Sequence, residues 1–184
     1  MERKEIHKKF WKILWDKEQE LKKERDGMFI NAWNFEANAT GQVGEILVKN
    51  IIADYGYQVD FKTIHDEYDL VFKNKKIEIK TAKLGKNKTF QFNGINTKYN
   101  YDFLICIGIE YDVIDYLILS KDQFFYDHKT KNEYVRFYNG KKEKCKKLVC
   151  MNPKNETNKK LTLSISDLSP EIENLFNKLN ELVK

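Results

Sequence analysis

Residues 68–82 read Tyr-Asp-Leu-Val-Phe-Lys-Asn-Lys-Lys-Ile-Glu-Ile-Lys-Thr-Ala, and this stretch decides the fold class that the sequence predicts. Two apolar-rich runs, Tyr68–Phe72 and Ile77–Ala82, flank a short segment in which Asn74 stands among three lysines. Strand-forming runs separated by a polar turn of this kind predict a β-hairpin.

The spacing within the hairpin places its charged residues on one face. Residues two apart on a strand point the same way, so Glu78 and Lys80 project together, while Ile77 and Ile79 face the opposite side, which must be core. Asp69 lies on the paired strand, from which it can meet Glu78 across the hairpin.

Periodicity predicts further elements on both sides of the hairpin. Amphipathic or capped helices are expected at Lys4–Arg25, Gly41–Tyr55 (capped by Thr40), Ser120–Phe125 and Pro170–Leu182. Strands are expected at Tyr57–Phe61, Tyr101–Ile109, Val113–Leu119, Tyr134–Tyr138, Leu148–Met151 and Leu161–Ile165. Together these elements predict an α/β (α+β) fold with a central mixed β-sheet flanked by helices.

Composition excludes several classes of protein. The chain has 184 residues, of which 41% are hydrophobic and 33% charged, so it is too rich in core-forming residues for disorder and too charged for a membrane protein. Its start has no secretory pattern, so we expect a cytoplasmic protein without a membrane partner. Three histidines and three cysteines without a CxxC spacing make a zinc site or a Ser-His-Asp triad a poor interpretation, and a metal would sit on oxygen ligands.

Positive charge is concentrated in two segments. Residues 73–98 hold eight lysines and one acid, and residues 131–160 hold ten basic residues and three acids, whereas the whole chain carries a net charge of only +5. Clustered basic segments on an otherwise acidic chain are typical of a phosphate-binding surface. The alternative is that these lysines merely cover solvated loops.

The hairpin also carries the residue types for metal-assisted phosphate chemistry. Two carboxylates, Asp69 and Glu78, beside the Lys80 ammonium suit a hard divalent cation such as Mg2+, which binds a few oxygens and accepts a substrate phosphate. The lysine can orient the attacking water or help to deprotonate it. The alternative is an ordinary exposed Glu-Lys pair on a half-buried strand.

The order of these residues resembles the PD-(D/E)XK nuclease superfamily, in which a helix with an acidic residue precedes a hairpin that carries an Asp and then Glu-x-Lys. The matching residues are Gly41-Gln42-Val43-Gly44-Glu45, Tyr68-Asp69-Leu70 and Ile77-Glu78-Ile79-Lys80-Thr81-Ala82, with Tyr68 in place of the proline of the family name. The resemblance covers about residues 41–83 and implies a restriction-endonuclease-like core.

The resemblance also implies roles for the site residues. Asp69 and Glu78 would bind Mg2+, with Mn2+ able to replace it, together with the Ile79 carbonyl. Lys80 would position the nucleophilic water, and Glu45 would reach the site through water or as a further ligand. Glu45 is equally interpreted as a solvent-facing acid of an amphipathic helix, and Glu67 shares the Asp69 face as a backup ligand.

DNA contacts are expected from the two basic segments. Lysines position a protein on phosphates, whereas Arg, Asn and Gln more often read bases. The predicted DNA-binding residues are Lys83, Lys86, Lys88, Gln91, Asn93, Arg136, Asn139, Lys141 and Lys142. For residues 89–94, a plain amphipathic strand is the competing interpretation.

The function predicted from these features is a Mg2+-dependent type II restriction endonuclease that cuts double-stranded DNA as a homodimer, because one centre cuts one strand. Residues 1–27 would form a helix for packing or dimerisation, residues 28–130 the catalytic core, and residues 131–184 the basic recognition segment and the C-terminal helix of the same domain. The alternatives are a Holliday-junction resolvase or DNA-repair nuclease, and a non-catalytic nucleic-acid-binding module.

Overall fold

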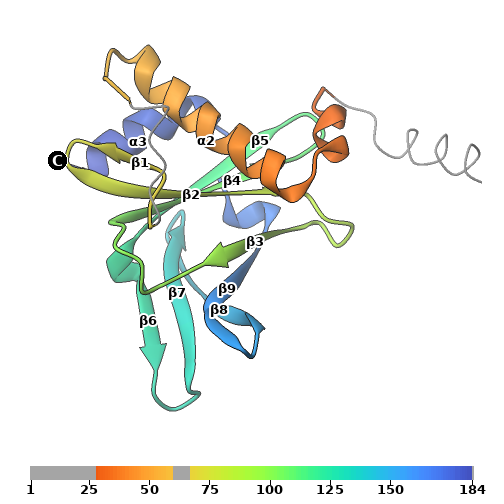
Figure 1. Ribbon diagram of the computed structural model, residues 1–184, viewed down its shortest axis with the longest axis vertical. Coiled ribbons are helices and arrows are strands. Elements are labelled where there is room, and N and C mark those ends of the chain that lie inside the picture. Colours follow the sequence, from red (N-terminus) through yellow and green to blue (C-terminus); the bar gives the residue numbers. More distant parts are fainter. Residues whose placement is uncertain (1–27, 60–66, 184) are drawn as a thin grey trace, which may run out of the picture.

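A mixed four-stranded sheet lies at the centre of the protein. The computed structural model describes residues 28–59 and 67–183 (Figure 1). The strands of this sheet follow the order β1-β2-β4-β5, with β2 parallel to β4 and the other neighbours antiparallel. Their bounds are β1 Leu70–Phe72, β2 Lys75–Lys83, β4 Phe103–Ile109 and β5 Ile114–Ser120. Every residue of β4 is buried, which confirms the prediction of a strand covered on both faces.

A second, five-stranded antiparallel sheet was not expected from the sequence. Its order is β3-β9-β8-β7-β6, with bounds β3 Thr89–Ile95, β6 Phe124–Asp127, β7 Asn132–Asn139, β8 Lys142–Asn152 and β9 Asn155–Ser164. Lysines occur at both half-buried and exposed positions of β8, with Lys144 and Lys146 half-buried and Lys147 exposed, so the alternation of a half-buried strand is hard to see in this basic stretch.

The two faces of the central sheet are covered differently, so that the chain is α/β with two sheets. Helices α2 (Ala37–Asp54) and α3 (Leu175–Leu182) both pack on one face, where they bury Ile52, Ile77 and Leu179. The second sheet covers the other face around a separate apolar cluster (Figure 1). The helices therefore flank one face only, because the apolar side chains of the second sheet cover the other.

Several element boundaries differ from those predicted. Helix α2 begins at Ala37, and Thr40 lies inside it, where its hydroxyl donates a hydrogen bond to the Glu36 carbonyl instead of capping the helix. Residues 57–59 are not a strand, and the rest of that predicted strand lies outside the described residues. The stretch predicted as a helix from Ser120 is a short 3-10 turn that leads into β6.

The C-terminal helix starts later than predicted. A 3-10 turn (Ile172–Asn174) separates Pro170 from α3, so the prolyl residue lies before the helix and not in its first turn. The predicted helix Lys4–Arg25, with its packing or dimerisation role, lies outside the described residues. Within the part that the structure describes, no helix is long and apolar enough to cross a membrane.

Candidate active site

The hairpin places Asp69 at an open stretch of the central sheet. Strand β1 has only three residues and its pairing with β2 ends at Ile77, whose carbonyl accepts a hydrogen bond of 2.9 Å from the Asp69 amide. The next outward amide, that of Ile79, donates instead to the Asp69 carboxylate, at 2.6 Å. The backbone of β2 thereby fixes the Asp69 carboxylate beside the Glu78-Ile79-Lys80 segment.

Glu78 and Lys80 project together from β2, as their spacing predicts. Their side chains form an ion pair, and Glu78 is only 6% exposed. Burial raises the pKa of Glu78 to about 7, Lys80 opposes this shift, and the nearby Asp69 and Glu45 charges add to it. Glu78 is therefore buried and close to other charged side chains, unlike the glutamate of an ordinary exposed Glu-Lys pair on a strand.

Glu45 joins the same cluster from helix α2. Burial and then the charge of Asp69 raise its pKa, while Lys49 and Lys80 oppose the shift. The helix can approach β2 closely because Gly44 faces Thr81, where a Cβ atom on residue 44 would lie 1.8 Å from the threonine hydroxyl oxygen. This close approach brings Glu45 near a hairpin that is more than twenty residues away in sequence.

A cavity of about 620 Å3 opens beside this cluster, and we call it the Glu45 cavity. Its walls combine the start of α2, the second half of β2 and the outward face of β3. They include Glu45 and Lys80 together with three of the predicted DNA-binding residues, Lys83, Gln91 and Asn93. Phe90 and Phe92 alternate with these polar residues and are fully buried, so β3 is an amphipathic strand whose polar face lines the cavity.

The structure does not bring the other predicted DNA-binding residues to this cavity. Lys86 and Lys88 are exposed in the loop before β3, and Arg136 is exposed on β7, where it pairs with Glu143 at 3.3 Å. The side chain of Asn139 lies outside what the structure describes. Lys86, Lys88 and Arg136 are not among the described residues that line the cavity with Glu45 and Lys80.

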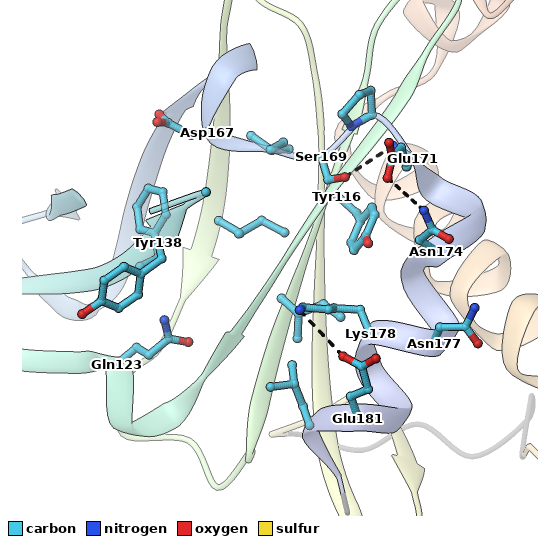
Figure 2. Close-up of a pocket in the computed structure, with 17 residues that line it drawn as sticks. Tyr116, Gln123, Tyr138, Asp167, Ser169, Glu171, Asn174, Asn177, Lys178 and Glu181 are labelled. Atoms are coloured by element: carbon cyan, nitrogen blue, oxygen red, sulfur yellow. Dashed lines mark hydrogen bonds and ion pairs between the residues drawn. The ribbon is translucent and has the colours of Figure 1, made fainter. Parts of the chain in front are cut away.

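Lys141 and Lys142 lie at the turn between β7 and β8, next to a different cavity of about 900 Å3 that is lined by Gly140 and helix α3. Figure 2 shows this α3 cavity, whose acidic side chains already have partners: Asn174 donates to Glu171 at 2.9 Å, and Lys178 pairs with Glu181 at 3.8 Å. Its acidic wall offers little to a phosphate backbone.

Comparisons of the chain with protein-family models, with curated proteins and with solved structures give no match.

Three residues near the cluster escaped the sequence analysis. Lys49 lies one helical turn after Glu45 and is 7% exposed, which a pattern search for i,i+4 pairs can find. Lys121 lies 3.8 Å from the centre of the Tyr101 ring, and burial followed by the nearby Glu78 charge raises the pKa of Tyr101. Only the pairing of β4 with β2 and β5 brings these two to the site, so no local sequence signal marks them.

Proposed function

We propose that this protein is a Mg2+-dependent endonuclease that hydrolyses DNA phosphodiester bonds. The observation that carries the proposal is the convergence of Glu45, Asp69 and Glu78 with Lys80 at one stretch of β2. Helix α2 supplies Glu45, and the hairpin supplies the other two acids and the lysine. The charges of these four residues affect one another, and the group lies beside a cavity with polar walls. Raised pKa values of grouped acids, as found here for Glu45 and Glu78, are typical of functional sites.

The surrounding topology supports a restriction-endonuclease-like core. An acid-bearing helix packs on the β1–β2 hairpin, β4 runs parallel to β2, and β5 returns antiparallel, so the order of elements agrees with the PD-(D/E)XK resemblance. This order of elements, together with Asp69, Glu78 and Lys80, is the basis for proposing that the chain belongs to this superfamily.

The donor set suits a hard divalent cation. Carboxylates and the Ile79 carbonyl are oxygen ligands, and the mutual repulsion among Asp69, Glu78 and Glu45 is what a bound cation relieves. Among the described residues, no group of three His, Cys, Asp or Glu side chains is already arranged to hold a metal ion. Lys80 contacts Glu78 directly, so metal binding requires this ammonium to move aside.

Each residue of the cluster then has a defined role. Asp69, Glu78 and the Ile79 carbonyl would hold Mg2+, and the cation would supply stabilisation of the negative charge on the phosphate oxygens. Lys80, once released from Glu78, orients the water that attacks phosphorus, while Glu45 holds a further water. A new P–O bond forms from the water, the bond to the 3′-oxygen breaks, and solvent protonates the leaving oxygen. Lys83, Gln91 and Asn93 position the strand along the cavity.

Within this class, the leading candidate is a type II restriction enzyme that acts on double-stranded DNA as a homodimer. A junction resolvase or DNA-repair nuclease is the second candidate, and a specific observation favours it. Lys141 and Lys142, two of the expected recognition residues, do not line the Glu45 cavity, and the residue before them, Gly140, lines the α3 cavity. This arrangement weakens the proposal that the basic segment, residues 131–160, reads the DNA sequence next to the phosphate that is cleaved.

Digestion of linear phage DNA and of a four-way junction tests the proposal. The purified full chain is incubated with each substrate in Mg2+ or EDTA, beside Asp69→Asn and Lys80→Ala, with Glu173→Gln on the exposed turn before α3 as a matched control. Discrete duplex fragments that require Mg2+ support restriction, whereas cleavage of the junction alone supports the second candidate. Inactivity of the wild type on both substrates contradicts the proposal, as does full activity of Asp69→Asn.

A further inference from the structure

A second, smaller cavity lies near the carboxylate cluster, and we call it the Lys121 cavity. Its volume is about 190 Å3, and it is lined by Thr97, Lys121, Phe124, Phe125, Tyr126 and Glu133. Sites for drug-sized ligands usually run from about 300 to 1,000 Å3. The Lys121 cavity is therefore of a size for one small ring system.

The walls of this cavity differ in chemistry. Phe124, Phe125 and Tyr126 supply aromatic surface from β6, and Tyr126 is 49% exposed. Glu133 adds a charged hydrogen-bond acceptor to this wall, and its carboxylate accepts a hydrogen bond of 2.7 Å from the Thr97 hydroxyl. Its other carboxylate oxygen lies 3.6 Å from the Lys159 ammonium. A carboxylate has about four acceptor positions, so beside these two contacts it can also accept from a ligand N–H group.

Lys121 connects this cavity to the cluster. Its ammonium lies 3.8 Å from the centre of the Tyr101 ring and donates to the Tyr99 carbonyl at 2.7 Å. Burial lowers the pKa of Lys121, and the charges of Glu133, Glu67 and Glu78 oppose that shift. The Lys121 ammonium therefore interacts electrostatically with Glu133 of the Lys121 cavity and with Glu78 of the carboxylate cluster.

We propose that the Lys121 cavity takes one unpaired nucleobase of the bound DNA strand, and that Glu133 selects bases with an exocyclic amine. The inference deepens the proposed function and rests on it, because the strand is the one whose phosphate enters the carboxylate cluster. Aromatic walls stack on a base of any kind, whereas a carboxylate accepts from an amine such as cytosine N4 and finds no donor at the corresponding uracil carbonyl. Lys121 contacts the adjoining phosphate.

Fluorescence anisotropy with labelled single strands tests this assignment without cleavage. The probes are 12-nucleotide oligomers of dC and of dU, which differ at each base only by the amine or carbonyl at position 4, at pH 8 in EDTA. We expect the wild type to bind dC about tenfold more tightly than dU. Glu133→Gln, which presents both a donor and an acceptor, removes this preference.

Two matched controls separate the cavity from general effects. Glu143→Gln, an exposed acid on the neighbouring strand, keeps the dC preference, and Tyr138→Ala, an exposed tyrosine of β7, keeps the affinity. Tyr126→Ala weakens both oligomers by about tenfold or more because a stacking surface is lost. Far-ultraviolet circular dichroism and thermal midpoints check that each variant is folded.

The outcomes for this inference and for the proposed function are separate. Equal binding of dC and dU by the wild type overturns the base assignment, even if the protein cuts DNA. A dC preference that survives in Glu133→Gln also overturns it. Preferential dC binding with no cleavage of any DNA substrate contradicts the proposed nuclease function and leaves a base-binding cavity.

Discussion

The contact between α2 and β2 at Gly44 makes a sharp prediction about how Glu45 reaches the site. Replacing Gly44 by alanine adds one Cβ atom, which would lie 1.8 Å from the Thr81 hydroxyl oxygen, 3.0 Å from its Cβ and 3.1 Å from its Cγ2. Rotation of the threonine can relieve the first contact, but its Cβ is fixed by the strand. The helix must therefore move away from the sheet, and Glu45 moves with it.

The size of the effect follows from two opposing contributions. Overpacking a close contact costs about 1–3 kcal/mol, and replacing a helical glycine by alanine returns about 0.5–1 kcal/mol. We expect Gly44→Ala to lower the free energy of unfolding by about 1–2 kcal/mol, which corresponds to a fall of about 3–8 °C in thermal midpoint for a domain of this size. Thermal unfolding followed by circular dichroism measures it.

A control and a rescue variant make this prediction refutable. Gly41 lies in the same helix with nothing within 4 Å of its would-be Cβ, so Gly41→Ala is expected to raise the midpoint by about 1–3 °C. Adding Thr81→Ala to Gly44→Ala removes two of the three close contacts and should recover at least half of the loss. Equal stabilisation by Gly44→Ala and Gly41→Ala would refute the close packing of α2 on β2.

Three further predictions concern buried groups away from the cluster. Burial and a hydrogen bond with Glu110 raise the pKa of Asp115 from 3.8 to about 7. The stabilisation by the protonated form is complete below about pH 4 and is lost as the pH rises through 7. Asp115→Asn should therefore raise the thermal midpoint by about 3 °C at pH 8 and have little effect below about pH 4. Burial alone would raise the pKa of Asp167, but hydrogen bonds from Lys144, Ser164 and Lys146 outweigh burial and hold that pKa at about 2. The resulting stabilisation is present above pH 4 and is lost as the pH falls toward 2. In urea unfolding, Asp167→Asn should therefore lower the free energy of unfolding by about 1–3 kcal/mol at pH 7 and by much less at pH 2. Gly108→Ala would place a Cβ 2.8 Å from the Phe90 ring and 3.0 Å from Leu168, so it should destabilise the protein by about 1–3 kcal/mol, and a neutral result would show that this core has room.

Much of the central sheet could be predicted because its residues carry strong local patterns. The alternation around Glu78 and Lys80 and the continuous apolar run of β4 each define a strand without reference to distant residues. The helix that carries Glu45 also has a clear local pattern of apolar residues. That pattern predicts a start at Gly41, whereas the helix begins at Ala37. Thr40 suggested a cap by residue type, yet its hydroxyl bonds within the helix.

The second sheet and the surroundings of the cluster depend on contacts that no local pattern encodes. Strand β3 pairs with β9, which is about seventy residues later, and only this pairing closes the second sheet beside the Glu45 cavity. Lys121 reaches the cluster through the pairing of β4 and β5. The same dependence explains why Lys141 and Lys142, which charge alone groups with the DNA contacts, do not line the Glu45 cavity.

Nicking of supercoiled plasmid DNA tests the central claim most directly, because it detects a single phosphodiester cleavage at any sequence. Wild-type protein, Glu78→Gln and Glu173→Gln are each titrated into plasmid with Mg2+ and with EDTA, and the circular forms are separated by electrophoresis. We expect nicked or linear product with wild type and Glu173→Gln in Mg2+ and none in EDTA. The cleavage rate of Glu78→Gln should be at least about a hundredfold lower, as is typical when a group that stabilises charge in the transition state is removed. Equal cleavage by Glu78→Gln, or none by the wild type, would contradict a nuclease centre at Glu45, Asp69, Glu78 and Lys80.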